Sequence, residues 1–219
     1  MPGAATEAVT DDGAALVRVL VVGDSISGHY MEFLPIHLGS LVASCTGGAD
    51  WSEMKGCSSN RMHAFMRCSE LLTAENIDRP DIVLFNCGLH DIMTARAGHP
   101  DRPEGDQAVP PDAYRTNLEQ IVALVRDSGA QPVWATTTPI YANSDGVVSR
   151  TGGYEGANFD RSNTTIDQYN AVASAVMAKH GVPIVDLHGF TSTFTGVHHM
   201  NGTYDSGAPS CAAVCAAEQ

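Results

Sequence analysis

The amino-acid sequence predicts an α/β fold, a three-layer α/β/α sandwich built on a parallel, flavodoxin-like sheet of five strands. Two observations lead to this prediction. Short runs of β-branched residues and leucine alternate with helical patterns along the chain, and these runs are largely apolar. Strands that are apolar on both faces are typical of a parallel sheet covered by helices on both sides. The 219 residues are enough to bury one sizeable core.

The five strands correspond to five short segments. We expect them over residues 17–22, 41–45, 81–87, 131–138 and 182–187. The first is followed by Gly23, the third by Gly88 and the fourth by Pro139. Glycine and proline at these points mark the turns that lead out of each strand.

Helical patterns fill the segments between and after the strands. We expect helices over residues 25–42, 59–73, 112–128, 165–180 and 210–218. Ser58 or Ser59 is expected to cap the second helix and Asp112 the third, because serine and aspartate accept hydrogen bonds from first-turn amides. Gly129 is expected to end the third helix.

Two polar segments interrupt the alternation. Residues 94–111 and 141–163 are rich in glycine and polar residues, and we expect both to be exposed loops. The second is of the kind that often shapes a binding rim. The sequence shows no internal repeat and no linker between domains. We therefore expect a flexible leader over residues 1–16 and a single domain over residues 17–219.

The charge balance restricts the partners that the chain can have. Twelve Lys and Arg against twenty-five Asp and Glu give a net charge of −13. Nucleic acids and anionic membrane surfaces both attract clustered basic residues, so neither is expected as a partner. No apolar run is long enough to span a bilayer. We expect a small ester molecule as the partner, while cytoplasmic and secreted locations and the oligomeric state stay open.

The six cysteines give no reason to expect a metal or redox centre. None of them forms a Cys-x-x-Cys pair, the spacing typical of zinc and thioredoxin-like sites. Cys87 lies within an apolar strand, where a thiol usually serves as a small hydrophobic group. We expect no metal and no cofactor.

The chemistry of the chain is expected beyond the carboxyl ends of the strands, where ligands bind in parallel α/β sheets. This rule selects Ser25, residues 88–91 and the turn after Leu187. Ser25 follows the first strand and opens a helix, and the N-terminus of a helix favours negative charge on a nearby oxygen. The same position also suits a serine that only caps the helix, so both interpretations stay open.

Gly23-Asp24-Ser25-Ile26 resembles the first sequence block of the SGNH, or GDSL, hydrolases, whose fourth residue is usually leucine. The resemblance implies that Ser25 is the nucleophile and that its backbone amide is part of the oxyanion hole. Asp24 is expected among the binding residues. Residues 133–139 and 169–187 are also similar to this family, so the resemblance extends over most of the chain.

The second block of the family is a glycine after the second strand, whose amide faces the oxyanion. Gly56, in the segment Lys-Gly-Cys-Ser-Ser-Asn, is the best match. Gly47 and Gly48 are competitors, and a plain turn is the other interpretation for all three. Asn60, at the end of the same segment, is expected among the binding residues.

The third block, Gly-x-Asn-Asp in the family, is Gly88-Leu89-His90-Asp91 in this chain. The family asparagine donates a hydrogen bond to the oxyanion, and the imidazole N–H of His90 can make the same kind of bond. Loss of one oxyanion donor costs about 100- to 1,000-fold in rate, so this replacement matters. Alternatively, His90 is a loop histidine bonded to a carboxylate such as Asp91, which is itself expected among the binding residues.

The last block, Asp-x-x-His, is best matched by Thr195-Gly196-Val197-His198. The resemblance implies that His198 is the general base, with His199 as the runner-up. Thr195 stands where the family has the acid that orients the base and stabilises its charged form. Either the site works as a Ser–His dyad, or another acid completes a triad. Asp186, at the end of the last strand, and Asp205 are the candidates.

These residues together imply a serine esterase that acts on small, short-acyl esters, of which acetyl groups on carbohydrates are one kind. An acyl-thioesterase or lysophospholipase of the same fold is an alternative. A binding domain with an impaired active site is another, because His90 and Thr195 both depart from the family pattern. A flavodoxin-like or nucleotide-binding protein is disfavoured, since the segment from Gly23 to Gly28 lacks the lysine of a P-loop and the glycine spacing of a dinucleotide site.

Overall fold

The computed structural model describes residues 17–24, 26–27, 30, 34, 42–47, 58–68, 72, 79–140, 147–150 and 158–192. The expected leader, the last expected helix and several expected site residues lie outside these ranges. Those site residues are Ser25, Gly56, Thr195, His198, His199 and Asp205.

Five parallel strands form the central sheet, in the order β2-β1-β3-β5-β8. They are β1 (Val17–Val22), β2 (Val42–Gly47), β3 (Ile82–Phe85), β5 (Gln131–Ala135) and β8 (Ile184–Val185). The prediction of an α/β fold with a flavodoxin-like parallel sheet is confirmed. In this order the carboxyl ends of β1 and β3 lie side by side, with Val22 paired to Phe85.

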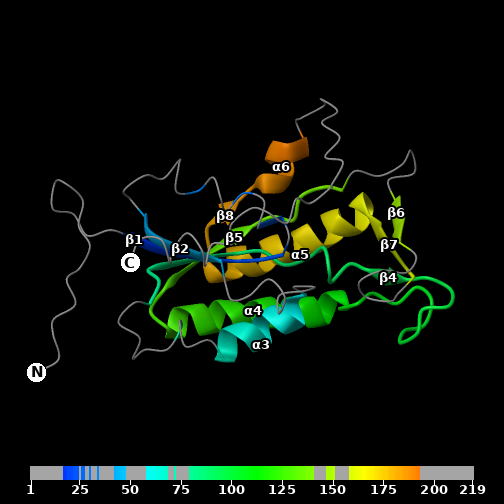
Figure 1. Ribbon diagram of the computed structural model, residues 1–219, viewed down its shortest axis with the longest axis horizontal. Helices are drawn as coiled ribbons and strands as arrows, with labels where there is room; N and C mark the ends of the chain where they lie inside the picture. Colours follow the sequence, from blue (N-terminus) through cyan, green and yellow to red (C-terminus); the bar gives the residue numbers. More distant parts are fainter. Residues whose placement is uncertain are drawn as a thin grey trace, which may run out of the picture.

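Three helices pack together as one layer. They are α3 (Ser59–Cys68), α4 (Pro111–Asp127) and α5 (Asn163–His180), and α4 contacts both of the others. The short helix α6 (Leu187–Ser192) lies apart from them, beyond β8 (Figure 1). From the helix expected over residues 25–42, the structure describes residues 26, 27, 30 and 34, which are helical, and Val42, which begins β2. Among the described residues, no helix is both long and apolar enough to cross a membrane.

The hydrophobic core lies between the sheet and this helical layer. It holds the strand residues Leu20, Val22, Val83, Phe85 and Trp134 and the helix residues Tyr114, Leu118, Ile121, Ile166 and Tyr169. Trp134 meets Phe85 edge-on at 5.3 Å between ring centroids, and Tyr114 lies 4.9 Å from Tyr169. The strand and helix side chains remove each other from water, which is why the strand sequences are largely apolar.

The two segments expected as exposed loops contain a second, smaller sheet. Strands β4 (Thr94–Ala95), β6 (Val147–Arg150) and β7 (Phe159–Ser162) form an antiparallel sheet in the order β4-β7-β6. Ala95 and Val109 are also buried, so the first segment is not simply exposed. The prediction missed these strands because their pairing uses backbone hydrogen bonds and leaves no apolar run in the sequence.

The ends of α4 and α5 differ in detail from the predicted helix boundaries. Asp112 does not cap α4. The helix starts at Pro111, where a missing N–H removes one group that would need a partner, and no side chain caps it. Ser162 caps α5 by accepting a hydrogen bond from the Thr165 amide at 3.1 Å. Gly129 follows the end of α4 with φ of +87°, as expected for a helix-ending glycine.

Candidate active site

Polar residues gather where β1 and β3 end. Asp24 follows β1 by two residues, and residues 86–91 follow β3 directly. Glycine is required at both exits: a Cβ on Gly23 would overlap the hydroxyl of Ser27, and one on Gly88 would overlap the hydroxyl of Thr137. The two glycine positions of the sequence blocks therefore allow these hydroxyl side chains to lie close against the backbone at this edge.

Asp24 is a buried carboxylate, with 2% of its surface exposed. Its Oδ1 accepts a hydrogen bond from the Ile26 amide at 2.9 Å, which makes Asp24 a cap for the chain that follows. Its Oδ2 accepts no hydrogen bond from the residues that the structure describes. Burial raises the pKa of Asp24, and the charges of His90 and Arg161 oppose that rise. His90 and Arg161 therefore lie within electrostatic range of this carboxylate.

Asp91 is a second buried carboxylate, and it is bonded to the first residue of α3. Both of its oxygens accept the Ser59 amide, at 2.8 and 3.1 Å, and Oδ1 also accepts the Ser59 hydroxyl at 2.6 Å. Ser59, expected as a helix cap, is thus a donor to Asp91. Burial raises the pKa of Asp91 to about 7, although the bonds from Ser59 act in the opposite direction.

Asn60 lies next to this contact, on the exposed side of α3. Asn117 of α4 donates from Nδ2 to the Asn60 side-chain oxygen at 2.6 Å and to the Ser59 hydroxyl at 2.9 Å. Asn60 is therefore held in place next to Ser59, the residue that donates to Asp91. Its role in binding stays a prediction.

His90 lies in a tight turn between Gly88 and Asp91 and is half-buried. The turn is closed by the Asp91 amide, which donates to the Gly88 carbonyl at 2.9 Å. Arg161 of β7 donates from Nε to the Leu89 carbonyl at 2.6 Å. His90 thus reaches the edge where β1 and β3 end, as the sequence block predicts.

A buried amide network supports the exit of β5. Asn86 donates from Nδ2 to the Ala135 carbonyl at 2.7 Å and to the Thr137 hydroxyl at 3.2 Å. Asn170 of α5 accepts from the Thr137 amide and donates to the Thr137 carbonyl, both at 2.9 Å. These bonds fix the ends of β3 and β5 relative to each other and to α5.

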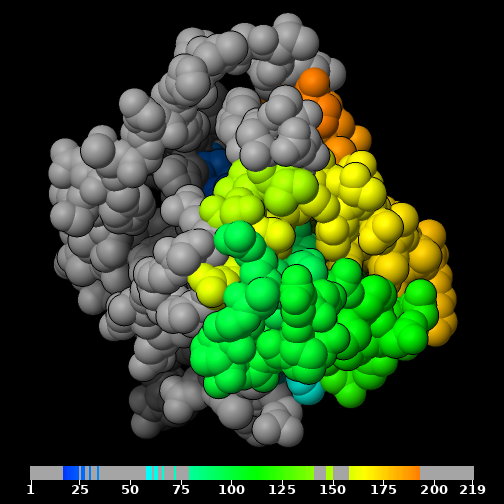
Figure 2. All heavy atoms as spheres, turned by 90° about the vertical axis from the view of Figure 1, so that its right-hand side faces the viewer, coloured from blue at the N-terminus to red at the C-terminus, as the bar shows by residue number. Residues whose placement is uncertain are grey.

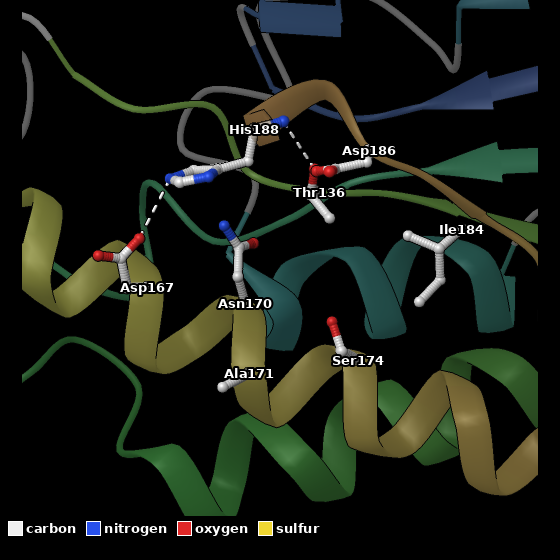
Figure 3. Close-up of a pocket in the computed structure, with 8 residues that line it drawn as sticks. All are labelled: Thr136, Asp167, Asn170, Ala171, Ser174, Ile184, Asp186 and His188. Carbon is white, nitrogen blue, oxygen red and sulfur yellow. Dashed lines mark hydrogen bonds and ion pairs between the residues drawn. The ribbon is translucent and has the colours of Figure 1, made fainter. Parts of the chain in front are cut away.

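Asp186 follows β8 and lines a pocket of about 420 Å³ between α5 and α6 (Figure 3). Its Oδ1 accepts from the Thr136 hydroxyl at 3.1 Å and from the Gly189 amide at 2.9 Å, so it caps α6. The Thr136 hydroxyl in turn accepts from the His188 amide at 2.8 Å. Asp186 therefore has a structural task, and its role as a triad acid stays a prediction.

His188 and Asp167 form an ion pair at one end of this pocket, with Nε2 3.2 Å from Oδ1 (Figure 3). Their side chains are 26% and 62% exposed. The remaining lining is made by Asn170, Ala171, Ser174 and Ile184. Within the described ranges, no three His, Cys, Asp or Glu side chains come together as a metal site.

The structure brings Asp24, His90 and Asp91 to one edge, with Asn60 beside them. Asp186 lies farther along the same edge, because β5 separates β8 from β3. In Figure 2 the blue segment around β1 is seen set back behind the green and yellow chain of the small sheet and its neighbours. The sequence did not indicate Arg161, which falls in a segment expected to be a loop, or the contact between Ser59 and Asp91.

The family model of the GDSL-like lipase/acylhydrolases matches residues 21–204, which is most of the chain. The chain belongs to this family. Membership in this family implies that the chain is a hydrolase that acts on esters.

Solved structures share the fold at low sequence identity. The structure titled TesA is 21% identical, with a TM-score of 0.51, and the match covers 90% of this chain and 91% of that one. A Bacteroides fragilis protein assigned as an acylhydrolase is 18% identical, with a TM-score of 0.50, over 83% of this chain and 71% of that one. No curated protein was found to match the sequence.

Proposed function

We propose that the chain is a serine esterase that hydrolyses small esters with short acyl groups, with Ser25 as the nucleophile. The observation that carries the proposal is the pair of buried carboxylates, Asp24 and Asp91, with the half-buried His90 where β1 and β3 end. In sequence, Asp24 directly precedes Ser25. Buried, mutually interacting titratable groups at the carboxyl edge of a parallel sheet are typical of catalytic sites.

The proposed reaction is acyl transfer in two steps. The Ser25 oxygen attacks the ester carbonyl carbon, and His198 takes the hydroxyl proton. The carbonyl electron pair moves to its oxygen, and the backbone amides of Ser25 and Gly56 with the His90 ring hold that oxyanion. The oxyanion then collapses and expels the alcohol, which receives the proton from His198. Water repeats the sequence on the acyl-enzyme and releases the acid.

Two features support His90 as the third oxyanion donor. Its turn follows β3 directly, which is where the family places its asparagine donor. The Asp24 carboxyl lies within electrostatic range of the ring, so the ring belongs to the polar group at this edge. An imidazole N–H can donate a hydrogen bond to an oxyanion, as the family asparagine does.

Two arrangements around His198 are compatible with the proposal. In the first, Ser25 and His198 act as a dyad, which agrees with the bonds that Asp186 makes to Thr136 and to the start of α6. In the second, Asp186 is also the triad acid. Both arrangements predict the same nucleophile and base, and they differ in how strongly the base is oriented.

The short acyl group is proposed from the family analogy and from the polar character of the surroundings. The pocket of Figure 3 offers hydroxyl, carboxylate and imidazole groups at the same edge of the sheet, which suits a hydroxyl-rich alcohol such as a sugar. A thioesterase or lysophospholipase would instead prefer longer acyl chains.

The proposal is tested by turnover of p-nitrophenyl esters from acetate to long-chain acids. We expect the highest kcat/KM with acetate, and we expect His198→Ala to remove most of that turnover because the nucleophile loses its base. Thr195→Ala should cost much less, since its hydroxyl supplies no full charge. Near-normal turnover in His198→Ala would show that the base is another residue, and a preference for long chains would favour the lipase-like alternative.

A further inference from the structure

The turn that carries His90 is fixed from two sides by side-chain hydrogen bonds. On one side, the Asp91 carboxylate accepts the amide and the hydroxyl of Ser59 at the start of α3. On the other side, Arg161 donates from Nε to the Leu89 carbonyl at 2.6 Å. His90 lies between the two anchored residues in the sequence, so both bonds restrict the same short stretch of backbone.

Arg161 is itself held by the small antiparallel sheet. It lies in β7, which pairs with β4 on one side and with β6 on the other. Its guanidinium carbon lies 4.9 Å from the ring centroid of Phe159, a side chain that is 8% exposed and packs with Met93. A guanidinium stacked on a buried ring loses little further freedom when it forms a hydrogen bond. The small sheet therefore presents a pre-oriented donor to the Leu89 carbonyl.

We propose that Arg161 and Asp91 are positioning residues that hold His90 where the oxyanion develops. The inference rests on the proposed esterase function and deepens it. Neither residue needs to touch the substrate: Arg161 acts through the Leu89 carbonyl and Asp91 through Ser59. The small sheet, which the sequence did not indicate, thereby gains a function as the support of the His90 turn.

Positioning of this kind affects the rate more than the binding of substrate. An oxyanion donor is effective only at about 2.7–3.1 Å from the oxygen that becomes charged. A displacement of about 1 Å at a catalytic group can cost about 100-fold in rate. An interaction that is strong only in the transition state lowers kcat when it is lost and leaves KM nearly unchanged. A purely structural role for Arg161 would lower stability without this separation of kcat from KM.

The chain offers a matched control for Arg161. Arg102 is also half-buried and also donates to a backbone carbonyl next to the small sheet, from Nη1 to Met93 at 2.8 Å. Its carbonyl partner lies three residues beyond His90, outside the turn. Arg102→Gln therefore removes a similar bond and the same charge from the same region without touching the His90 turn.

The test measures kcat, KM and Tm with p-nitrophenyl acetate for the parent, Arg161→Gln, Arg161→Lys and Arg102→Gln. We expect Arg161→Gln to lower kcat about 10- to 100-fold, with KM changed less than about 3-fold. Arg161→Lys should lower kcat nearly as much, because lysine keeps the charge but lacks the Nε–H of the planar guanidinium. Arg102→Gln should stay within about 2-fold of the parent in kcat, because its bond lies outside the His90 turn.

Two results would overturn the positioning role. One is a kcat for Arg161→Gln equal to that of Arg102→Gln, and the other is full kcat in Arg161→Lys, which would leave only a charge effect. If Arg161→Gln does not fold, Asp91→Asn is the deciding variant. A fall in its kcat of up to about 10-fold at constant KM supports the proposal, since a neutral amide oxygen holds Ser59 more weakly. An unchanged kcat contradicts the proposal. An inactive parent contradicts the esterase function itself.

Discussion

Two histidines lie at the carboxyl edge of the same sheet, and their surroundings differ. His90, after β3, lies among carboxylates that are almost fully buried: Asp24 is 2% exposed and Asp91 0%. His188, after β8, pairs with Asp167 at the rim of an open pocket, where the two side chains are 26% and 62% exposed (Figure 3). Each histidine thus faces acidic groups, one set inside the protein and the other at its surface.

The comparison shows that burial decides what a carboxylate can do at this edge. Water screens the pair of His188 and Asp167, and such surface pairs contribute about 0–1 kcal/mol. Asp24 and Asp91 have lost their water, so their ionised forms are disfavoured and their pKa values are raised. A protein keeps such groups where their hydrogen bonds or charges are needed. The buried region is therefore the better candidate for the chemistry, and the open pocket is the better candidate for contact with the alcohol part of a substrate.

The largest difference between the regions is expected when one carboxylate is removed from each. Asp91→Ala should lower the free energy of unfolding by about 2–4 kcal/mol, because the buried amide and hydroxyl of Ser59 lose their acceptor. Asp167→Ala should change it by less than about 1 kcal/mol. Urea denaturation at pH 4.5, where the contribution of Asp91 is still present, measures both values. Equal losses in the two variants would show that burial does not distinguish the regions.

A smaller effect is expected in the dependence of stability on pH. The folded-state pKa of Asp91 is about 7, above the ordinary value of 3.8, so between these values the folded protein binds more protons than the unfolded chain. The contribution of Asp91 to stability is therefore complete below about pH 4 and is lost as the pH rises through about 7. Relative to Asp91→Asn, the parent should lose on the order of 1–3 kcal/mol over this range.

This pH dependence is measured by urea denaturation of the parent and of Asp91→Asn at several values from pH 4.5 to 8. The pKa of Asp24 is raised in the parent as well. Because Asp24 is present in both proteins, most of its effect is removed when the two curves are subtracted. Parallel curves for the two proteins would contradict the burial of an ionisable Asp91.

Much of the fold could be predicted from the sequence because the central strands are buried. Val17–Val22 and residues 81–87 are largely apolar runs that a glycine follows, and the strands that form there, β1 and β3, are neighbours in the sheet. The small sheet could not be predicted in this way. Its strands β6 and β7 carry polar side chains and pair through the backbone, which the sequence does not record. Asp112 misled the helix prediction because Pro111 starts α4 without a side-chain cap.

The candidate site divides in the same manner. The positions of Asp24, His90 and Asp91 at this edge could be predicted, since each comes shortly after a recognisable strand and belongs to a short block. The bond between Asp91 and Ser59 could not, because 32 residues separate the two and only the packing of α3 brings them together. The bond from Arg161 to the Leu89 carbonyl spans 72 residues and depends on a sheet that the sequence did not indicate. Long-range polar contacts of this kind depend on the folded arrangement and not on local pattern.

The central claim is that Ser25, which follows the buried Asp24 in the sequence, is an activated nucleophile. It is tested most directly by treating the intact protein with a fluorophosphonate probe and locating the adduct by mass spectrometry. We predict one adduct per chain, on Ser25, and no adduct in Ser25→Ala. A folded parent protein that remains unlabelled, or a label that persists in Ser25→Ala, would contradict the account.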